Sequence, residues 1–553
     1  MRNFFIVAVL VMVVSCKKGS DNPAPPSNPP AALKLTAAAV DNVATGAALY
    51  GVRLSPIIKL TFDNKVDRNT ASAISFSNSG AVAVNYSVLY SAGDSVVQLQ
   101  PASPLLALTK YQIAISSGLK SSAGGSLNGA TSFVFNTGID SSDKLPPISD
   151  SALVTLVQQQ TFKYFWDFAH PVSGLARERS NGDNNVITSG GSGFGVMAML
   201  VGVNRGFITR AQGLTRMQTI VSFLKNTAQR FHGAYPHWLN GTTGAVIPFS
   251  TKDNGADLVE TAYLIQGLLC ARQYFNGSDA TETTLRTDIN SIWQSVEWNW
   301  FRKNGENVLY WHWSPNYNWD MNVQIKGWNE CLITYALAAA SPTYSIPKVV
   351  YDNGWASNGG MKSGATYFGY TLPLGPNLGG PLFFEHYSFL GINPFGLTDA
   401  YAAYQTQTVN HTKINYEYCK ANPKGWYGYS DACWGLTASD VPNGYTASSP
   451  TNDVGVIAPT AALSSFPYTP TESMKALKFF YYKLGDKLWG DYGFKDAFNL
   501  HEPWFAPSYL AIDQGPIVVM MENYRTGLLW NLFMSCPEVK TGMTSLGFAS
   551  PRL

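Results

Sequence analysis

Residues 252–275 read KDNGADLVETAYLIQGLLCARQYF, and their spacing decides how the larger part of the chain folds. Apolar residues recur at i, i+3, i+4 and i+7 from Ala256 onward, which predicts a helix. On that helix Asp253, Asp257 and Glu260 would place three carboxylates on one face. Like charges at this spacing weaken a helix by roughly a few tenths of a kcal/mol per pair. The dipole at a helix N-terminus accounts for Asp253 and Asp257 better than for Glu260, so the stripe points to a function.

The same helical period runs through the chain from about residue 150. It is clear in SALVTLVQQQTFKYFWDF (151–168), GFGVMAMLVGVNRGF (193–207), IKGWNECLITYALAAA (325–340) and PIVVMMENYRTGLLWNLFMS (516–535). Long loops rich in Gly, Pro and aromatic residues separate the helices, and there is no strand–helix alternation typical of a β/α barrel. We therefore predict an all-α toroid over 150–553, a ring of helix pairs whose loops build a cleft at one end.

The region 33–140 has the sequence pattern of β-strands. Apolar and polar residues alternate in LSPIIKLTFDNKVD (54–67), YQIAISSGL (111–119) and TSFVFNTG (131–138), with turn residues between them. This pattern predicts an all-β sandwich, and the stretch resembles the bacterial Ig-like domains that precede catalytic modules. No constellation of acids, His or Ser stands out in it, so we interpret it as a spacer or a weak binding module.

The N-terminus predicts export. Residues 1–16 read MRNFFIVAVLVMVVSC, with a basic residue at position 2 and an apolar run too short to span a bilayer. The ending VVSC resembles a lipobox, so we expect a lipoprotein signal peptide with Cys16 lipidated; a plain secretory signal is the alternative. Residues 17–32 are a Pro/Ser-rich tether. The expected location is the outer membrane or the periplasmic face, anchored at Cys16.

The composition of the chain limits the chemical class of its binding partner. Charged residues make up 13% of the chain, against roughly 25% in ordinary soluble domains. Aromatic residues also reach 13%, and the net charge is only +2 without a cluster of Lys or Arg. Nucleic acids and polyanionic substrates need such a cluster, which argues against both. A neutral, polyhydroxylated partner suits this composition, because sugar C–H faces pack on rings, although most rings are expected to fill the core.

The cysteines do not indicate a metal centre or a complete disulfide framework. With Cys16 lipidated, five remain, so they cannot all pair within the chain. Three fall in apolar helical stretches and are expected to be buried thiols, namely Cys270, Cys331 and Cys536. A disulfide bridge between Cys419 and Cys433 is the one pairing that the sequence leaves open. No CxxC motif or His-rich cluster suggests a transition-metal site.

Two further acids stand out from their surroundings. Glu330 lies beside Trp328 and just ahead of an apolar helical segment, where a carboxyl resists ionisation; a helix cap or a surface position is the alternative. Asp513 is a lone acid between YLAI and GPIVVMM, and an unpaired carboxylate is costly to bury. Asp513 therefore either lines a cleft or caps a helix. The alternating charges of RERSN (177–181) are more simply a self-satisfied ionic loop, kept as a possible cleft contact.

Other chemistries lack their motifs. There is no GxSxG nucleophile elbow, no Cys/His pair signposted in sequence, and no phosphate-binding P-loop. His237 and His312 are flanked by rings, which favours sugar contacts over metal ligation. What remains is hydrolysis of a neutral glycan by paired carboxylates. One acid protonates the departing glycosidic oxygen while another activates water or attacks directly.

Several long segments resemble one family. They include FKYFWDFAHPVSGLARERSN (162–181), YPHWLNGTTGAVIPFSTKDNGADLVETAYLIQGLLCARQYF (235–275), LYWHWSPNYNWDMNVQIKGWNE (309–330) and EPWFAPSYLAIDQGPIVVMMENYRTGLLWNLF (502–533). The family is the bacterial "putative glucoamylase" group, which contains the endo-β-1,2-glucanases of glycoside hydrolase family 144. The resemblance runs from about residue 150 to the C-terminus, and it implies an (α/α)6 barrel that hydrolyses β-1,2-glucan with inversion, without a metal or organic cofactor.

The resemblance also implies roles for residues. Glu330 in KGWNE is the expected general acid, and Asp513 in AIDQGP is the expected general base acting through a water. Asp253, Asp257 and Glu260 would line the subsites around the scissile bond, with Asp257 and Glu260 as the alternative catalytic pair. The residues predicted to bind substrate are Arg177, His237, Trp238, Trp311, His312, Trp328, Glu385 and Trp434. We expect a monomer.

Four rival functions stay open at this stage. Release of the disaccharide sophorose from chain ends differs from internal cleavage only in how the cleft is closed. A non-catalytic glycan-binding lipoprotein would keep the fold without the chemistry. A polysaccharide lyase needs cations around a uronate, and a phosphorylase needs a basic phosphate pocket; the predicted cleft loops are poor in Lys and Arg.

Overall fold

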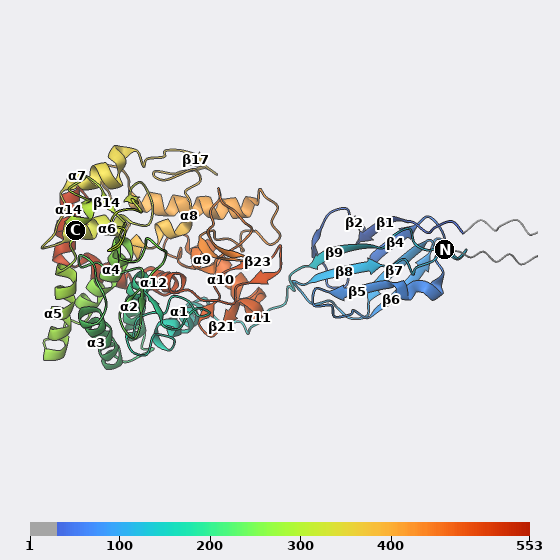
Figure 1. Cartoon of the computed structure of the whole chain (residues 1–553), viewed down its shortest axis with the longest axis horizontal. Coiled ribbons are helices and arrows are strands. Elements are labelled where there is room, and N and C mark those ends of the chain that lie inside the picture. The colour runs from blue at the N-terminus through green and yellow to red at the C-terminus, as the bar shows by residue number, and fades with distance from the viewer. Residues whose placement is uncertain (1–29) are drawn as a thin grey trace, which may run out of the picture. The chain divides into compact units, whose positions relative to one another are not determined.

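The computed structural model describes residues 30–553, so Cys16, the signal segment 1–16 and most of the tether lie outside the described residues. The chain divides into two compact units. Among the described residues, one unit comprises 30–105 together with 110–135, and the other comprises 106–109 together with 136–553. The first is built from strands and the second mainly from helices (Figure 1). Within 30–553, no helix combines the length and apolar character needed to cross a membrane.

The first unit is the predicted antiparallel β-sandwich. Its strands are β1 (Leu35–Val40), β2 (Val43–Ala44), β3 (Leu49–Val52), β4 (Ile58–Phe62), β5 (Ile74–Asn78), β6 (Tyr86–Ser91), β7 (Val96–Pro101), β8 (Lys110–Ile115) and β9 (Thr131–Thr137). They form a five-stranded sheet in the order β2-β1-β4-β7-β6 and a four-stranded sheet in the order β3-β9-β8-β5. Alternate residues of β4 are buried, and its Ile58 and Leu60 join one core with Ile113 of the other sheet.

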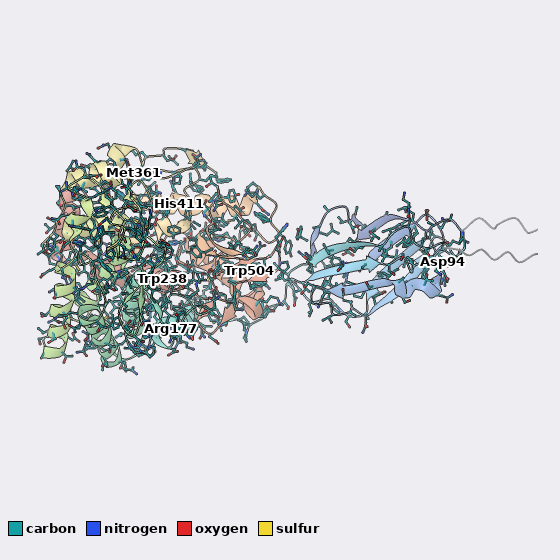
Figure 2. All side chains as sticks on the ribbon, viewed as in Figure 1. Asp94, Arg177, Trp238, Met361, His411 and Trp504 are labelled. Atoms are coloured by element: carbon teal, nitrogen blue, oxygen red, sulfur yellow. The ribbon has the colours of Figure 1, made fainter. Side chains whose placement is uncertain are left out.

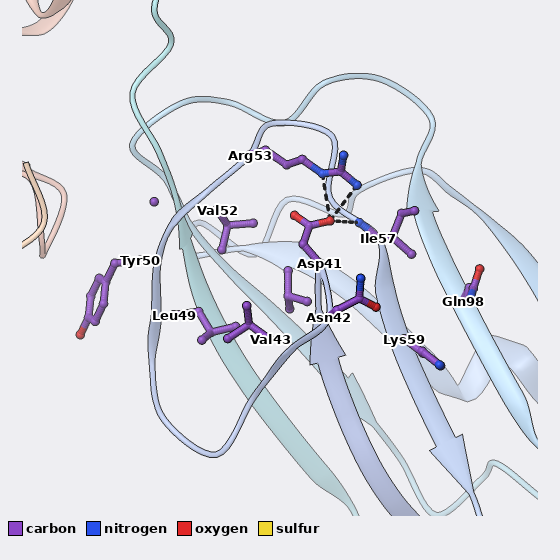
Figure 3. A pocket seen from close by; sticks show the side chains of 12 residues that line it. Asp41, Asn42, Val43, Leu49, Tyr50, Val52, Arg53, Ile57, Lys59 and Gln98 are labelled. Atoms are coloured by element: carbon purple, nitrogen blue, oxygen red, sulfur yellow. Dashed lines mark hydrogen bonds and ion pairs between the residues drawn. The ribbon is translucent and has the colours of Figure 1, made fainter.

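A pocket of about 540 Å³ lies in this unit, beside the turn between β1 and β2 (Figure 3). Asp41 accepts hydrogen bonds from the Arg53 side chain and from the backbone N–H of Ile57, at 2.9 and 3.0 Å. Every buried side-chain nitrogen or oxygen in the described part of this unit has a hydrogen-bond partner. No unpartnered buried polar group is therefore aimed at a ligand here, and the role as a spacer or weak binding module stays a prediction.

The second unit contains two kinds of helix. Its helices are α1 (Asp150–Trp166), α2 (Ser189–Asn204), α3 (Arg210–Asn226), α4 (Leu258–Tyr274), α5 (Ala280–Gln294), α6 (Leu332–Ala340), α7 (Lys348–Val350), α8 (Tyr404–Ala421), α9 (Pro459–Leu463), α10 (Pro470–Lys478), α11 (Gly485–Leu488), α12 (Ala511–Thr526), α13 (Leu528–Met534) and α14 (Pro537–Leu546). Helices α2 and α4 are buried on all sides over most of their length, whereas α5 buries only one stripe. A helix that is apolar all round must be enclosed by others, so α2 and α4 lie inside and α5 lies outside.

Close packing of the inner helices fixes where the candidate site lies. Helix α2 packs against both α4 and α12. A Cβ atom at Gly193 would collide with the backbone oxygen of Tyr263, so only glycine allows α2 and α4 to approach this closely. The N-terminal ends of α2, α4 and α12 are thereby held together.

Short antiparallel ladders join the loops that the sequence presents as irregular. They are β10 (Val186–Thr188), β11 (Trp238–Asn240), β12 (Val246–Ile247), β13 (Ala256–Asp257), β14 (Leu309–Tyr310), β15 (His312–Trp313), β16 (Gln324–Ile325), β17 (Thr366–Tyr367), β18 (Tyr370–Thr371), β19 (Ala438–Val441), β20 (Gly444–Ala447), β21 (Trp489–Gly490), β22 (Gly493–Phe494), β23 (Phe498–Asn499) and β24 (Trp504–Phe505). The pairing of β13 with β15 places Asp257 opposite His312. These ladders were not predicted, because strands of two to four residues carry no clear periodicity.

The helical stripe of three acids is corrected by the structure. Helix α4 begins at Leu258, so Glu260 is in the helix but Asp253 and Asp257 precede it. The physical reason is capping: the Asp257 carboxylate accepts hydrogen bonds from the N–H groups of Val259 and Glu260, and a cap residue has extended rather than helical backbone.

The prediction of three buried thiols is confirmed. Cys270, Cys331 and Cys536 are buried free thiols. Cys419 and Cys433 are also buried and free, so the optional bridge is not formed. Burial raises the pKa of the Cys270 and Cys433 thiols, which keeps them unreactive.

Candidate active site

Three helix N-termini meet at one pocket of about 340 Å³ in the helical unit. That volume lies within the roughly 300–1,000 Å³ of small-ligand pockets. The pocket is lined by Glu178, Arg179, Thr188, His237, Trp238, Phe249, Glu260, Tyr445, Leu510 and Ile512. Thr188 precedes α2, Glu260 lies in the first turn of α4, and Ile512 lies in the first turn of α12. Positive ends of three helix dipoles therefore surround the pocket, which suits acidic side chains.

Two of the three stripe acids are held by these helix ends. Asp257 caps α4, as described above. Glu260 accepts a hydrogen bond of 2.7 Å from the backbone N–H of Gly190, in the first turn of α2. A Cβ atom at residue 190 would collide with the Glu260 carboxylate, so any larger residue there would displace that carboxylate from its present position. The helix dipoles make the crowding of acids tolerable.

Histidines complete the cluster around these acids. His237 Nδ1 lies 3.1 Å from Asp257 Oδ2, and its ring stacks on Phe249 at 4.3 Å. His312 Nε2 lies 3.6 Å from Asp253 Oδ2 and 3.8 Å from Asp257 Oδ2. Burial opposes a charge on His237, but Glu260 and the hydrogen bond with Asp257 raise its pKa to about 9. Burial and the neighbouring Asp257 raise the pKa of Asp253 to about 7.

The same cluster offers a donor set for a cation. His237, Asp253 and Asp257 each present one ligand atom within 4.8 Å of the others. The same side chains also bond to one another, because His237 Nδ1 lies 3.1 Å from Asp257 Oδ2.

Glu330 lies two residues before α6, against this cluster. Its backbone oxygen accepts a hydrogen bond from the Ser388 hydroxyl, which fixes the position of the turn. Burial raises the pKa of the Glu330 carboxyl to about 7, and the charges of Glu260 and Asp257 act in the same direction. A carboxyl with this pKa is substantially protonated near neutral pH and can donate a proton.

Asp513 lies in the first turn of α12, beside a second group of acids. Its side chain is 2% exposed, and its Oδ2 atom has no hydrogen-bond donor among the described residues. Asp496 is its direct neighbour, and Asp440 lies beyond. Arg179 binds Asp440 through Nη1, at 3.1 and 3.2 Å, and Glu178 through Nε, at 2.8 Å. The arginine therefore neutralises the outer acids and makes no ion pair with Asp513.

Tyr387 shows that the two groups of acids face each other. Burial raises the pKa of the Tyr387 hydroxyl, and the charges of Asp513, Glu330 and Glu260 all raise it further. A single buried side chain thus lies within electrostatic reach of all three carboxyls. Its ring contacts Phe194 of α2 at 5.2 Å and Tyr263 of α4 at 5.7 Å, between the helices that carry the site.

Six predicted substrate contacts lie away from the pocket lining, and one of them is His312, placed above beside Asp253 and Asp257. Arg177, marked with Trp238 in Figure 2, donates to the backbone oxygens of Phe168 and Asn184 instead. Trp328 donates its indole N–H to Glu385, which is fully buried and also binds His411 at 2.6 Å. The other two are Trp311, whose ring stacks on His312, and Trp434, which is fully buried and donates to the backbone of Glu472.

These positions correct the substrate-contact interpretation for the most buried residues. Glu385 and Trp434 have no exposed surface, so neither touches a ligand in this conformation. Glu385 Oε1 is bound by Trp328, Gln407 and His411, whereas Glu385 Oε2 has no partner among the described residues. Trp434 bonds to the backbone alone, as buried polar groups of a core commonly do. The pocket residues His237, Trp238 and Glu260 are the predicted ones that line it.

Sequence reasoning missed several residues of the site. Phe249 and Tyr445 line the pocket with half-exposed rings, at 50% and 49% exposure. The sequence does offer a signal for both residues: Phe249 lies in the polar, turn-rich segment AVIPFS and Tyr445 in NGYT. An aromatic ring in such a segment is expected at the surface, where exposed apolar groups often mark a binding site. Asp440 and Asp496 were also missed, and the RERSN loop proved to be both self-paired and part of the lining.

The Arg179 network predicts a stability effect. We expect Arg179→Gln to lower the free energy of unfolding of the helical unit by about 3 kcal/mol at pH 7, because Glu178 and Asp440 lose their counter-charge. All 15 Trp lie beyond residue 150, so tryptophan fluorescence in a denaturant titration reports this unit alone. The deficit should shrink as pH falls and the two acids become protonated.

A matched control separates this effect from loss of any surface charge. Lys475 pairs with Asp431 at 3.1 Å, and both side chains are about half exposed. Lys475→Gln should cost less than about 1 kcal/mol, as exposed pairs do. Equal effects of the two substitutions would contradict the role given to Arg179.

Comparisons with known proteins agree on one kind of relative. Residues 322–537 match the family model described as "Putative glucoamylase", and residues 31–137 match that of a bacterial Ig-like domain. A curated relative, the exo β-1,2-glucooligosaccharide sophorohydrolase (non-reducing end) of Parabacteroides distasonis, is 48% identical over 421 residues. That match covers 72% of this chain and 58% of the relative, so the chain spans just over half of the relative's length.

Solved structures give closer likenesses. A structure described as a "putative glucoamylase" from Bacteroides uniformis is 59% identical with a TM-score of 0.73, and the endo-β-1,2-glucanase of Chitinophaga pinensis, in complex with sophorotriose and glucose, is 56% identical with a TM-score of 0.72. Each match covers 74% of this chain and 100% of the other. The endo-β-1,2-glucanase of Talaromyces funiculosus, at 11% identity and a TM-score of 0.54, shares the fold alone.

Proposed function

Because this chain belongs to the "Putative glucoamylase" family, whose solved members include an endo-β-1,2-glucanase, we propose that it is a glycoside hydrolase that cleaves β-1,2-glucan. The observation that carries the proposal is that Glu330 and Asp513 both lie within electrostatic reach of the buried Tyr387. Neither acid makes a salt bridge in the described part of the chain. Neither carboxyl lines the pocket itself, although Asp513 directly follows Ile512, which does. Two unneutralised carboxyls near a pocket suited to a neutral sugar are the groups that glycoside hydrolysis needs.

In the proposed reaction Glu330 is the acid and Asp513 the base. The Glu330 carboxyl donates its proton to the glycosidic oxygen as the bond to the anomeric carbon breaks. Asp513 removes a proton from a water molecule, whose oxygen forms the new bond on the opposite face of the sugar. The anomeric configuration is thereby inverted. Phe249 and Tyr445 offer apolar faces for the sugar rings, while His237 and Glu260 offer hydrogen bonds to hydroxyls.

The helix arrangement supports an (α/α)6 barrel. Enclosed helices alternate with one-sided ones along the chain: α2 is followed by α3, α4 by α5, and α9 by α10. In such a ring the inner helices point the same way, so their N-termini and loops gather at one end. This alternation is what we expect of a closed ring of inner and outer helices around the site.

The acid–base pair predicts a bell-shaped pH profile. Glu330 must be protonated, and burial raises its pKa to about 7, so kcat/KM should fall about tenfold per unit as pH rises beyond 7. Asp513 must be ionised, which sets the acidic limb. Initial rates of reducing-sugar release between pH 4 and pH 9 test this, and a plateau extending to about pH 9 would contradict Glu330 as the acid.

The substrate assignment is tested with a panel of glucans. Linear β-1,2-glucan should be degraded, while β-1,3-, β-1,4- and α-1,4-glucans should not. Product sizing over time separates the two modes of action: internal cleavage gives a ladder of intermediate lengths, and release from chain ends gives sophorose from the start. We favour internal cleavage, as in the Chitinophaga pinensis relative, with sophorose release as the alternative. Absence of any product would favour a glycan-binding lipoprotein.

The pocket chemistry disfavours the lyase and phosphorylase alternatives. Arg179 is the one Lys or Arg that lines the pocket, and it is already paired with Glu178 and Asp440. A uronate or phosphate would have to compete with both acids for it. Unsaturated products absorbing in the ultraviolet, or a phosphate requirement, would revive these functions.

The setting of the enzyme is also proposed. A lipid anchor at Cys16, the tether and the sandwich unit would hold a monomeric hydrolase at the outer membrane or the periplasmic face. Labelling with a radioactive fatty acid in a bacterial host, lost in Cys16→Ala, tests the anchor.

A further inference from the structure

A second pocket of the helical unit adjoins the candidate active site and has no part in the reaction described above. Its volume is about 390 Å³, and its lining includes Trp426, Asn443, Tyr445, Asn499 and Glu502. We call it the Trp426 pocket. Tyr445 lines both this pocket and the active-site pocket, so the two cavities meet at this residue.

The hairpin of β19 and β20 forms the wall between the two pockets. Asp440 and Tyr445 are opposite each other in its register. The Asp440 carboxylate is bound by Arg179, which lines the active-site pocket, at 3.1 Å. Asn443 and Thr446 of the same hairpin line the Trp426 pocket instead. A chain that leaves the active-site pocket across the half-exposed ring of Tyr445 therefore enters the Trp426 pocket.

Trp426 is an aromatic surface that the protein holds in one position. Its indole N–H donates to Asp453, which is 4% exposed, at 2.9 Å. Asn422 accepts a hydrogen bond from the backbone N–H of Trp426 and donates one to its backbone oxygen, both at 2.8 Å. The ring packs so closely on Gly455 that a Cβ atom there would collide with it. With its polar atom satisfied, the half-buried ring offers the pocket an apolar surface on which the C–H face of a sugar can pack.

Asn499 supplies a buried donor at the same pocket. Its side chain is 4% exposed and belongs to the lining. Its Oδ1 accepts hydrogen bonds from the backbone N–H groups of His501 and Glu502, at 2.9 and 3.0 Å, which fixes the orientation of the amide. Its Nδ2 donates to no other described residue. A buried donor without an acceptor is unfavourable, so this amide suits a ligand oxygen that enters the pocket.

The charge of the lining selects for a neutral ligand. Glu502 is the one charged residue among those that line the pocket, and it is exposed. No Lys, Arg or His belongs to this lining, so a polyanion finds no counter-charge here. Sugar hydroxyls can donate to the Glu502 carboxylate and accept from the Asn499 amide.

We propose that the Trp426 pocket is a remote binding site for the glucan chain whose cleavage occurs in the neighbouring active-site pocket. The inference rests on the proposed function and deepens it, because it names the long chain as the preferred substrate. Sugars beyond those held at the active site would pass Tyr445, pack on Trp426 and hydrogen-bond to Asn499 and Glu502. Chains long enough to fill both pockets should therefore bind more tightly than short ones.

The test is the dependence of kcat/KM on chain length for β-1,2-linked glucooligosaccharides. For the wild type, kcat/KM should rise once the chain is long enough to reach the Trp426 pocket. Trp426→Ala should abolish this rise, lowering kcat/KM on long chains about three- to tenfold through a higher KM. The shortest cleaved oligosaccharides should react as they do with the wild type. Loss of a residue that only supports the fold would lower kcat/KM at every length.

Trp489→Ala is the matched control. Trp489 and Trp426 are both partly buried against the same apolar core, but Trp489 lines neither pocket. Trp489→Ala should keep the wild-type length dependence even if stability falls. Glu502→Ala removes an exposed carboxylate and leaves the core intact, so it decides if Trp426→Ala does not fold. It should lower kcat/KM on long chains about threefold and leave short ones unchanged.

Calorimetry supplies a readout that does not require turnover. In the Glu330→Gln background, Trp426→Ala should weaken binding of long linear β-1,2-glucan about three- to tenfold and leave binding of sophorotriose unchanged. The inference is overturned if Trp426→Ala and Glu502→Ala both keep the wild-type length dependence, or if their losses are equal on short and long chains. If the wild type cleaves no glucan, the proposed function fails, while titration of the wild type and Trp426→Ala with long glucan still tests the binding site.

Discussion

Glu330→Gln is expected to lower kcat/KM on β-1,2-glucan by about 10²–10⁴-fold, because glutamine keeps the shape of the side chain but has no acidic proton to donate. The leaving sugar oxygen would then depart as an alkoxide. The effect should depend on the leaving group: a β-linked sophoroside of nitrophenol needs little protonation, so the loss on that substrate should be much smaller. Initial rates on both substrates measure the difference.

The control for this substitution is Glu417→Gln. Glu417 lies on α8, pairs with the exposed Lys420 at 3.1 Å, and is not among the pocket residues. Its activity should stay within about twofold of the wild type. Equal losses for Glu330→Gln on the natural and the activated substrate would show that Glu330 has another role, such as holding the sugar.

Asp513→Asn is expected to cause a loss of about 10³-fold that does not depend on the leaving group, because an amide cannot accept the proton of water. The folded state should not suffer. Burial raises the pKa of Asp513 in the folded state, so the wild type loses stability as pH rises and this carboxyl ionises. The neutral Asn does not ionise and avoids this loss. The free energy of unfolding of Asp513→Asn relative to the wild type should therefore increase with pH.

Rates on the two substrates and denaturant titrations at pH 6 and pH 9 test both parts. A site selected for activity rather than stability should become inactive and more stable together when its costly charge is removed. Loss of activity accompanied by unfolding would instead make Asp513 a structural residue.

Particular residues show how much of the fold and of the site can be predicted from the sequence. The helical period predicted α2, α4 and α12, because long, strongly periodic segments are dominated by burial. It placed the stripe acids in the helix, although Asp257 is the cap and Asp253 precedes it. An Asp before an apolar helix is a typical cap, and this signal in the sequence already favours Asp257 as the cap of α4.

The buried acid Asp496 was missed for a different reason. Asp496 follows Lys495, and adjacent opposite charges in a sequence look like a surface pair. In the structure Lys495 donates to the backbone oxygen of Lys487, and Asp496 points inward to Asp440 and Asp513. Successive side chains of an extended segment point to opposite sides, so neighbours in sequence are separated in space.

Exposed and buried rings were likewise indistinguishable by composition. Trp434 and Phe249 both occur in aromatic-rich loops, yet Trp434 is enclosed and Phe249 is half exposed in the pocket. Only the tertiary packing decides which ring a sugar can reach. Residue type therefore identified the kind of partner better than the individual contacts.

The most direct measurement is the anomeric form of the first product. Proton nuclear magnetic resonance of β-1,2-glucan mixed with a high concentration of enzyme follows the new reducing end before the anomers equilibrate. If Asp513 activates water opposite a bond protonated by Glu330, the α-anomer appears first, and neither Glu330→Gln nor Asp513→Asn produces it at a comparable rate. First appearance of the β-anomer, or unchanged release by either variant, would contradict the account.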